Sequence, residues 1–225
     1  MTVQRMGLPD WTLAAVPFLF IYAPVGLCAW RKVDSYAYRI AIPAFSDGKA
    51  WGEALWLVAK VVALILIPWL AAYHVWQNFV VLAIKAHKLG VLDPLFTGSL
   101  LDTVTPRFRL PKDWLLLVPY HLFFVAIPEE FFYRGYFQTR LNEVFPRKFL
   151  VFGVPIGWGL VIASLFFAFG HSLVTVRWWH FATFFPGLLF GWLRERSGGT
   201  LAGALMHAWS NVTVVCLDTW YGVIP

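Results

Sequence analysis

Two adjacent carboxylates and an arginine interrupt a long apolar run, in the segment 128–135 of sequence Pro-Glu-Glu-Phe-Phe-Tyr-Arg-Gly. A charge at the middle of a bilayer costs about 2.5–3.5 kcal/mol on insertion scales, so ionisable residues there are candidates for function. Glu130 and Arg134 are four residues apart, share a helical face and are expected to form an ion pair. Glu129 points about 100° away and keeps a less compensated charge, which suits a general base. The alternative is a helix end at the membrane surface, where these charges meet water.

Two later apolar runs each carry a histidine. His171 follows the run 166–170, whereas His207 lies four residues before Asn211, so that these last two side chains project from one helical face. Small residues before His207, among them Gly203, permit close approach by another helix. The alternatives are a histidine at the membrane surface for His171, and hydrogen bonds that merely join two helices for His207 and Asn211.

Together these side chains offer the chemistry that hydrolysis of an amide needs. A carboxylate activates a water molecule, imidazoles relay protons or bind the oxyanion, and a carboxamide N–H stabilises the developing charge. The chain has no His-Glu-x-x-His motif, and no serine or cysteine is placed as an evident nucleophile beside a base.

The composition indicates a membrane protein. Of the 225 residues, 60% are hydrophobic and only 13% are charged, a larger apolar excess than a soluble domain of this size has to bury. Apolar runs of about 20 residues, long enough to cross about 30 Å of hydrocarbon, recur from end to end. The 13 Trp and 8 Tyr suit the aromatic belts at the two membrane interfaces.

The pattern predicts an all-α fold, a polytopic transmembrane helix bundle with about six spans and a polar intramembrane cavity. The candidate spans are 11–30, 54–84, 114–138, 149–170, 178–193 and 200–221. No polar stretch is long enough to fold separately, so residues 1–225 are expected to form a single membrane domain. Residues 114–215 would form its catalytic core, and residues 1–113 would add accessory spans and an interfacial connection at 85–113.

The net charge of +6 is concentrated in the connecting segments. We interpret it as attraction to the anionic headgroups of a lipid bilayer, and we expect no nucleic-acid partner. Loops after the first, third and fifth spans carry nine basic residues against seven on the other side, which slightly favours both termini outside. The nine are Arg31, Lys32, Arg39, Lys49, Arg140, Arg147, Lys148, Arg194 and Arg196.

The polar motifs resemble those of the CAAX protease and bacteriocin-processing family (CPBP or ABI-type), which are polytopic intramembrane endopeptidases. Three motifs of that family have counterparts here, in the same order: Glu129-Glu130-x-x-x-Arg134, Phe167-x-x-x-His171 and His207-x-x-x-Asn211. The stretch 185–194 is also similar to the family's penultimate helix. The resemblance covers roughly residues 114–215 and leaves residues 1–113 without a family motif.

The resemblance implies a role for each motif residue. Glu129 would activate the attacking water with assistance from His171, whereas His207 and Asn211 would stabilise the tetrahedral oxyanion. Glu130 and its arginine partner would be supporting residues. The family is glutamate-dependent, which implies no cofactor. A zinc-dependent variant remains open, because one carboxylate and two imidazoles also match a catalytic zinc ligand set.

The resemblance does not fix the substrate, and the expected location rests on the short six-span form and the lack of organelle signals. The substrate would be a membrane-associated peptide or protein tail, and the protein would be a multi-pass protein of the bacterial inner (cytoplasmic) membrane. The alternative is a non-enzymatic transporter or an immunity or binding factor, in which the same polar cluster relays protons or holds a ligand. The paired repeats and interrupted helices common in transporters are not apparent in the sequence.

Overall fold

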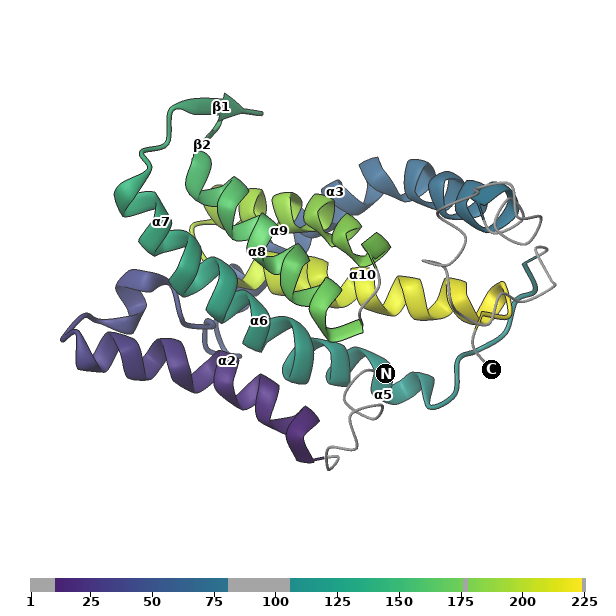
Figure 1. Cartoon of the computed structure of the whole chain (residues 1–225), viewed down its shortest axis with the longest axis horizontal. Coiled ribbons are helices and arrows are strands. Elements are labelled where there is room, and N and C mark those ends of the chain that lie inside the picture. The colour runs from purple at the N-terminus through teal and green to yellow at the C-terminus, as the bar shows by residue number, and fades with distance from the viewer. Residues whose placement is uncertain (1–10, 81–105, 176–177, 224–225) are drawn as a thin grey trace.

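The computed structural model describes residues 11–80, 106–175 and 178–223, and most of these residues are helical. The predicted all-α architecture is therefore confirmed. The helices labelled in Figure 1 are α2 (Trp11–Trp30), α3 (Gly48–Val75), α5 (Trp114–Pro119), α6 (Ile127–Glu130), α7 (Gln138–Val144), α8 (Trp158–Thr175), α9 (Phe184–Ser197) and α10 (Leu201–Trp220). Most of the predicted interfacial connection at 85–113 lies outside the described residues.

Helices α5, α6 and α7 are parts of one long helix, Trp114–Val144. Two π-helical segments, Tyr120–Ala126 and Phe131–Phe137, lie between them. Pro119 and Pro128 adjoin the first of these segments, and a proline cannot donate a backbone hydrogen bond to the preceding turn. Widened turns of this kind are frequent at functional sites. They flank the short α-helical turn that carries Glu129 and Glu130.

Two of the described helices are long and apolar enough to cross a membrane, Gly48–Asn78 and Trp114–Val144, with 31 residues each. Only 11% and 22% of their most apolar windows are buried inside the protein. A core helix of a soluble protein would be mostly buried, so these apolar side chains face outward. Ala15–Trp30 and Trp158–Ser172 are shorter apolar helices.

The structure corrects the predicted start of the span 149–170. Strands β1 (Phe149–Val151) and β2 (Val154–Ile156) form an antiparallel hairpin, and α8 begins only at Trp158. The hairpin turn is made by Phe152 and Gly153, both with positive φ (51° and 72°), as two-residue turns with the twist of a β-ribbon require. An apolar hairpin has the composition of a span, so hydropathy alone did not separate it from the helix.

Other boundaries also differ from the prediction. Helix α3 begins at Gly48 rather than residue 54, because Asp47 caps it by accepting a hydrogen bond from the Ala50 N–H at 3.1 Å. The span predicted at 178–193 begins with a 3₁₀ segment, Trp178–Thr183, before α9 continues to Ser197.

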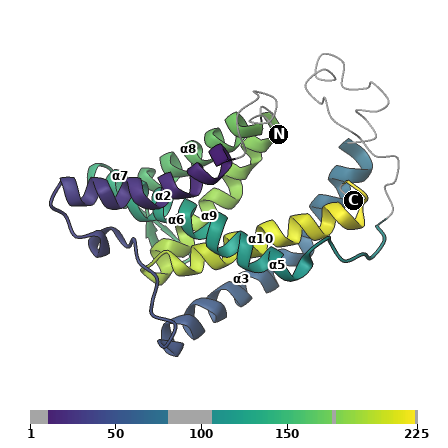
Figure 2. The same ribbon diagram turned by 90° about the horizontal axis from the view of Figure 1, so that it is seen from below.

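The long helix Trp114–Val144 lies between the other helices (Figure 1). Helix α2 packs on one side of it, whereas α8 and α10 pack on the other. Helix α10 also packs along α3, which Figure 2 shows from below, and against α9. The core between them contains Phe167, Phe190, Leu193 and Met206. This arrangement brings together the three segments that carry the predicted polar motifs.

Close contact between α9 and its neighbours depends on Gly191. A Cβ atom at this position would lie 2.9 Å from both Gln138 Oε1 and Leu160 Cγ. We predict that Gly191→Ala lowers the free energy of unfolding by about 1–3 kcal/mol through overpacking, measured by thermal unfolding in detergent. Gly52→Ala in α3 is the matched control, since its Cβ would meet nothing within 4 Å, and it should leave stability unchanged or slightly raised. Equal stability of the two variants would contradict the prediction.

Candidate active site

A fully buried ion pair forms the back of the site. Arg134 Nη1 lies 3.2 Å from Glu130 Oε1, and both side chains are 0% exposed. This confirms the pairing predicted from their four-residue spacing. Arg134 Nη2 donates a hydrogen bond to the Gly187 carbonyl of α9 at 3.1 Å, and its guanidinium lies 4.2 Å from the centre of the Phe167 ring. The arginine therefore connects the long helix to both α8 and α9.

His207 of α10 completes the buried part of the site. Its Nδ1 lies 3.2 Å from Glu130 Oε1, and its ring stacks on Phe190 with a centroid distance of 4.8 Å. A carboxylate only accepts hydrogen bonds, so Nδ1 carries the proton and Nε2 faces the opposite way. Gly203 permits this approach of α10, because a Cβ there would lie 3.0 Å from Glu130 Oε2.

His171 of α8 is oriented by its own helix. Its Nδ1 lies 3.0 Å from the Phe167 carbonyl oxygen, which can only accept, so that Nδ1 again carries the proton. The Phe167 ring packs on the imidazole with a centroid distance of 4.4 Å. His171 and His207 thus each use Nδ1 for orientation and present Nε2 to the same space.

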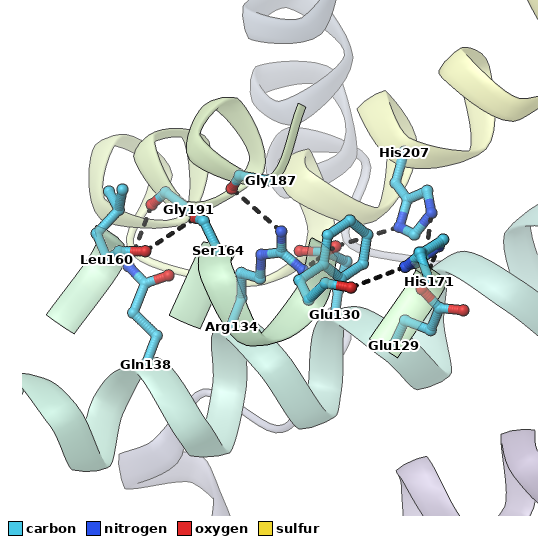
Figure 3. Close-up of polar contacts among 11 residues, drawn as sticks. Glu129, Glu130, Arg134, Gln138, Leu160, Ser164, His171, Gly187, Gly191 and His207 are labelled. Carbon is cyan, nitrogen blue, oxygen red and sulfur yellow. Dashed lines mark hydrogen bonds and ion pairs between the residues drawn. The ribbon is translucent and has the colours of Figure 1, made fainter. Parts of the chain in front are cut away.

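Glu129 faces both of these Nε2 atoms (Figure 3). Its Oε2 lies 3.8 Å from Nε2 of His171 and 3.9 Å from Nε2 of His207. These distances are too long for direct hydrogen bonds, and a water molecule between the groups could donate one hydrogen bond to Glu129 Oε2 and one to an Nε2 atom. The side chains of Glu129 and His171 are 16% and 31% exposed, whereas that of His207 is 3% exposed. The site therefore has a fully buried back and a partly exposed front, in which Glu129 Oε2 itself is buried.

Asn211, which was predicted to act together with His207, is less tightly linked to the site. Asn211 is half-buried one turn after His207 on α10. Among the described residues, no hydrogen bond or ion pair joins its side chain to the other motif residues. Its assigned role thus stays a prediction.

His121, which is not among the predicted site residues, lies on the same long helix as Glu129. Its buried Nδ1 has no hydrogen-bond partner in the described part of the chain. The available signal was its position eight residues before Glu129, two helical turns along the same predicted span.

A network around Glu195 holds α9 against the end of the long helix. Its Oε1 accepts hydrogen bonds from Gln138 at 2.9 Å, Asn142 at 2.9 Å and Arg194 at 2.6 Å, and its Oε2 lies 3.1 Å from Nε of Arg147. The network fixes the two helices whose contact positions Arg134 on the Gly187 carbonyl.

Within residues 11–80, 106–175 and 178–223, no group of three His, Cys, Asp or Glu side chains has an arrangement that could hold a metal ion. Glu129 and the two imidazoles provide acid–base groups around one shared space.

The fold and the site define a helical membrane protein whose packed helices bring ionisable groups together. Residues 111–213 match the family described as Type II CAAX prenyl endopeptidase Rce1-like. The segment that carries the site is therefore similar to this family of CAAX-type proteases, and the long apolar helices indicate an integral membrane protein. No curated protein and no solved structure matches the chain.

The buried arginine generates a testable prediction about stability. Arg134→Gln would leave the Glu130 carboxylate without its cationic partner in a region that excludes water. We expect a loss of about 3–5 kcal/mol in the free energy of unfolding, measured by thermal unfolding of the purified protein in detergent. Arg31→Gln makes the same change at an exposed position and should alter stability by less than about 0.5 kcal/mol. A small effect at both positions would show that the ion pair is not needed for folding.

Proposed function

We propose that the protein is an endopeptidase that cleaves a membrane-associated peptide or protein tail with a water molecule activated by Glu129. One observation carries the proposal: a single carboxylate oxygen faces two imidazole Nε2 atoms at 3.8 and 3.9 Å. A water molecule bound between them could give its proton to the carboxylate while an imidazole orients its lone pair. No covalent enzyme intermediate is required.

The proposed reaction begins with attack of this water on the scissile carbonyl carbon. Glu129 takes the proton of the water, with His171 assisting, and a tetrahedral oxyanion forms. In its imidazolium form, which keeps the Nδ1 proton on the Glu130 side and carries a second proton on Nε2, His207 donates a hydrogen bond to the oxyanion, and Asn211 donates another. The C–N bond then breaks, the proton held by Glu129 passes to the leaving amine, and the products are a carboxylate and an amine.

Glu130 and Arg134 support this reaction without contacting the substrate. Glu130 holds the Nδ1–H of His207 at 3.2 Å and so fixes the direction of Nε2. Arg134 balances the Glu130 charge, so that the negative charge of Glu129 at the front remains available as a base. Carboxylates that orient histidines have the same function in other catalytic sites.

The proposed location of the protein is the inner (cytoplasmic) membrane of a bacterium. The chain would cross this membrane several times, with both termini outside. The two long apolar helices and the two shorter ones support several crossings. All proposed catalytic residues lie within residues 129–211, inside the matched segment 111–213, which supports residues 114–215 as the catalytic core.

Replacement of the proposed base tests this function directly. Glu129→Gln keeps the shape of the side chain but cannot accept the proton of water, so cleavage should fall by at least about a hundredfold. Comparative peptidomics of membranes containing the wild-type or the variant protein would measure cleavage and identify the substrate. Glu143→Gln, on the same long helix but partly exposed beside Arg140, is the matched control and should retain activity. Normal processing by the Glu129 variant would instead favour a non-enzymatic role of the polar cluster.

We propose that this chemistry proceeds without a metal ion, since acid–base groups alone account for every proton transfer. Incubation of the purified protein with a zinc chelator should therefore leave the rate of peptide cleavage within about twofold of the untreated rate, a change of less than about 0.5 kcal/mol in the barrier. Loss of cleavage that added Zn²⁺ restores would establish the zinc-dependent variant, with Glu129, His171 and His207 as its ligand set.

A further inference from the structure

A pocket of about 690 Å³ lies away from the glutamate–histidine site, where α3 and α10 begin. Its walls come from the segment between α2 and α3, from the first turns of α3 and from the turn between α9 and α10. Its volume is in the range of pockets that hold small molecules. Ala202 lines the pocket, whereas the next residue, Gly203, contacts Glu130, so the two sites lie on different faces of α10.

The pocket is positively charged. Arg39, Lys60 and Arg196 line it together with one carboxylate, Glu53, which leaves an excess of two positive charges. No ion pair joins any of the three cations to a carboxylate within the described residues. Cations gathered in a concave site without carboxylate partners are suited to bind an anion.

Two of the cations are held in place by their neighbours. The Lys60 ammonium lies 4.9 Å from the centre of the Trp56 ring. The Arg39 guanidinium lies against Gly198 in the turn between α9 and α10, where a Cβ would be 3.0 Å from Nη1. Gly198 has a φ of 75°, which glycine adopts without strain. The turn therefore accommodates the arginine side chain.

The position of the pocket indicates a lipid rather than a soluble anion. It lies along the first turns of α3, whose apolar surface is mostly unburied. Trp56, Leu57 and Ile42 provide apolar walls beside the cations, a combination typical of the interface between headgroups and hydrocarbon. Membrane surfaces with anionic lipids attract basic side chains in this region.

From these observations we propose that the pocket binds the phosphate headgroup of an anionic phospholipid. The cations would contact the phosphate oxygens, and the first acyl carbons would lie along Trp56 and Leu57. The proposal does not depend on peptidase activity, since the pocket and the glutamate–histidine site share no side chain.

The test uses the full chain in lipid nanodiscs of phosphatidylcholine mixed equally with phosphatidylglycerol. Native mass spectrometry would count the phosphatidylglycerol molecules that stay bound after release from the disc. The pocket variant combines Arg39→Gln, Lys60→Gln and Arg196→Gln. Each lost cation lowers affinity for anionic lipid about fivefold and all three about a hundredfold, so this variant should lose its bound phosphatidylglycerol.

The matched control removes three positive charges outside the pocket, by Arg31→Gln, Lys49→Gln and Lys148→Gln, and should keep the bound lipid. Equal loss in both variants would overturn the proposal, because it would indicate attraction to total charge alone. Displacement of the lipid by equimolar glycerol phosphate would also overturn it, because the pocket would then bind a soluble phosphate. The same holds if a peptide with a free C-terminal carboxylate displaces the lipid and the peptide with an amidated C-terminus does not. If the triple variant does not fold, the lipid measurement is repeated with Arg39→Gln alone. An unchanged melting temperature would show that this variant is folded. Glu129→Gln should bind lipid normally, which separates this result from the test of peptidase activity.

Discussion

The arrangement of the site depends on the buried ion pair between Glu130 and Arg134. Neither charge can be exposed to water without moving a helix, and separating them would leave each charge alone in an apolar interior. Glu130 also accepts a hydrogen bond from His207 on α10, and Arg134 also donates one to the Gly187 carbonyl on α9. One pair of opposite charges therefore fixes the relative positions of three helices, and with them the direction of one imidazole.

Backbone features make these close contacts possible. The π-helical segments on both sides of Glu129 and Glu130 change the helical phase around the two acids, and Gly187, Gly191 and Gly203 remove side chains where helices meet. As a result, α10 has two functions on two of its faces. Its inner face supplies His207 to the buried carboxylate, and its first residues line the basic pocket beside α3.

Much of the fold could be predicted from hydropathy because apolar runs of helical length dominate the chain. Helix α2 matches its predicted range, and α10 matches within one residue at each end. Hydropathy predicted two boundaries wrongly. At 149–156 an apolar hairpin was taken for part of a span, and at α3 the Asp47 cap extends the helix into polar sequence. Turn geometry and capping decide those boundaries, and neither changes the mean hydropathy of a window.

The sequence by itself determined the residues that meet within one helix, because a fixed helical rise places Glu130 beside Arg134 and His207 near Asn211 in any fold. Only the tertiary structure decided which helices meet. The position of Glu129 Oε2 between two Nε2 atoms depends on the packing of α8 and α10 against the long helix, as Figure 3 shows. Contacts between distant segments are set by the packing of whole helix surfaces, which no local spacing encodes.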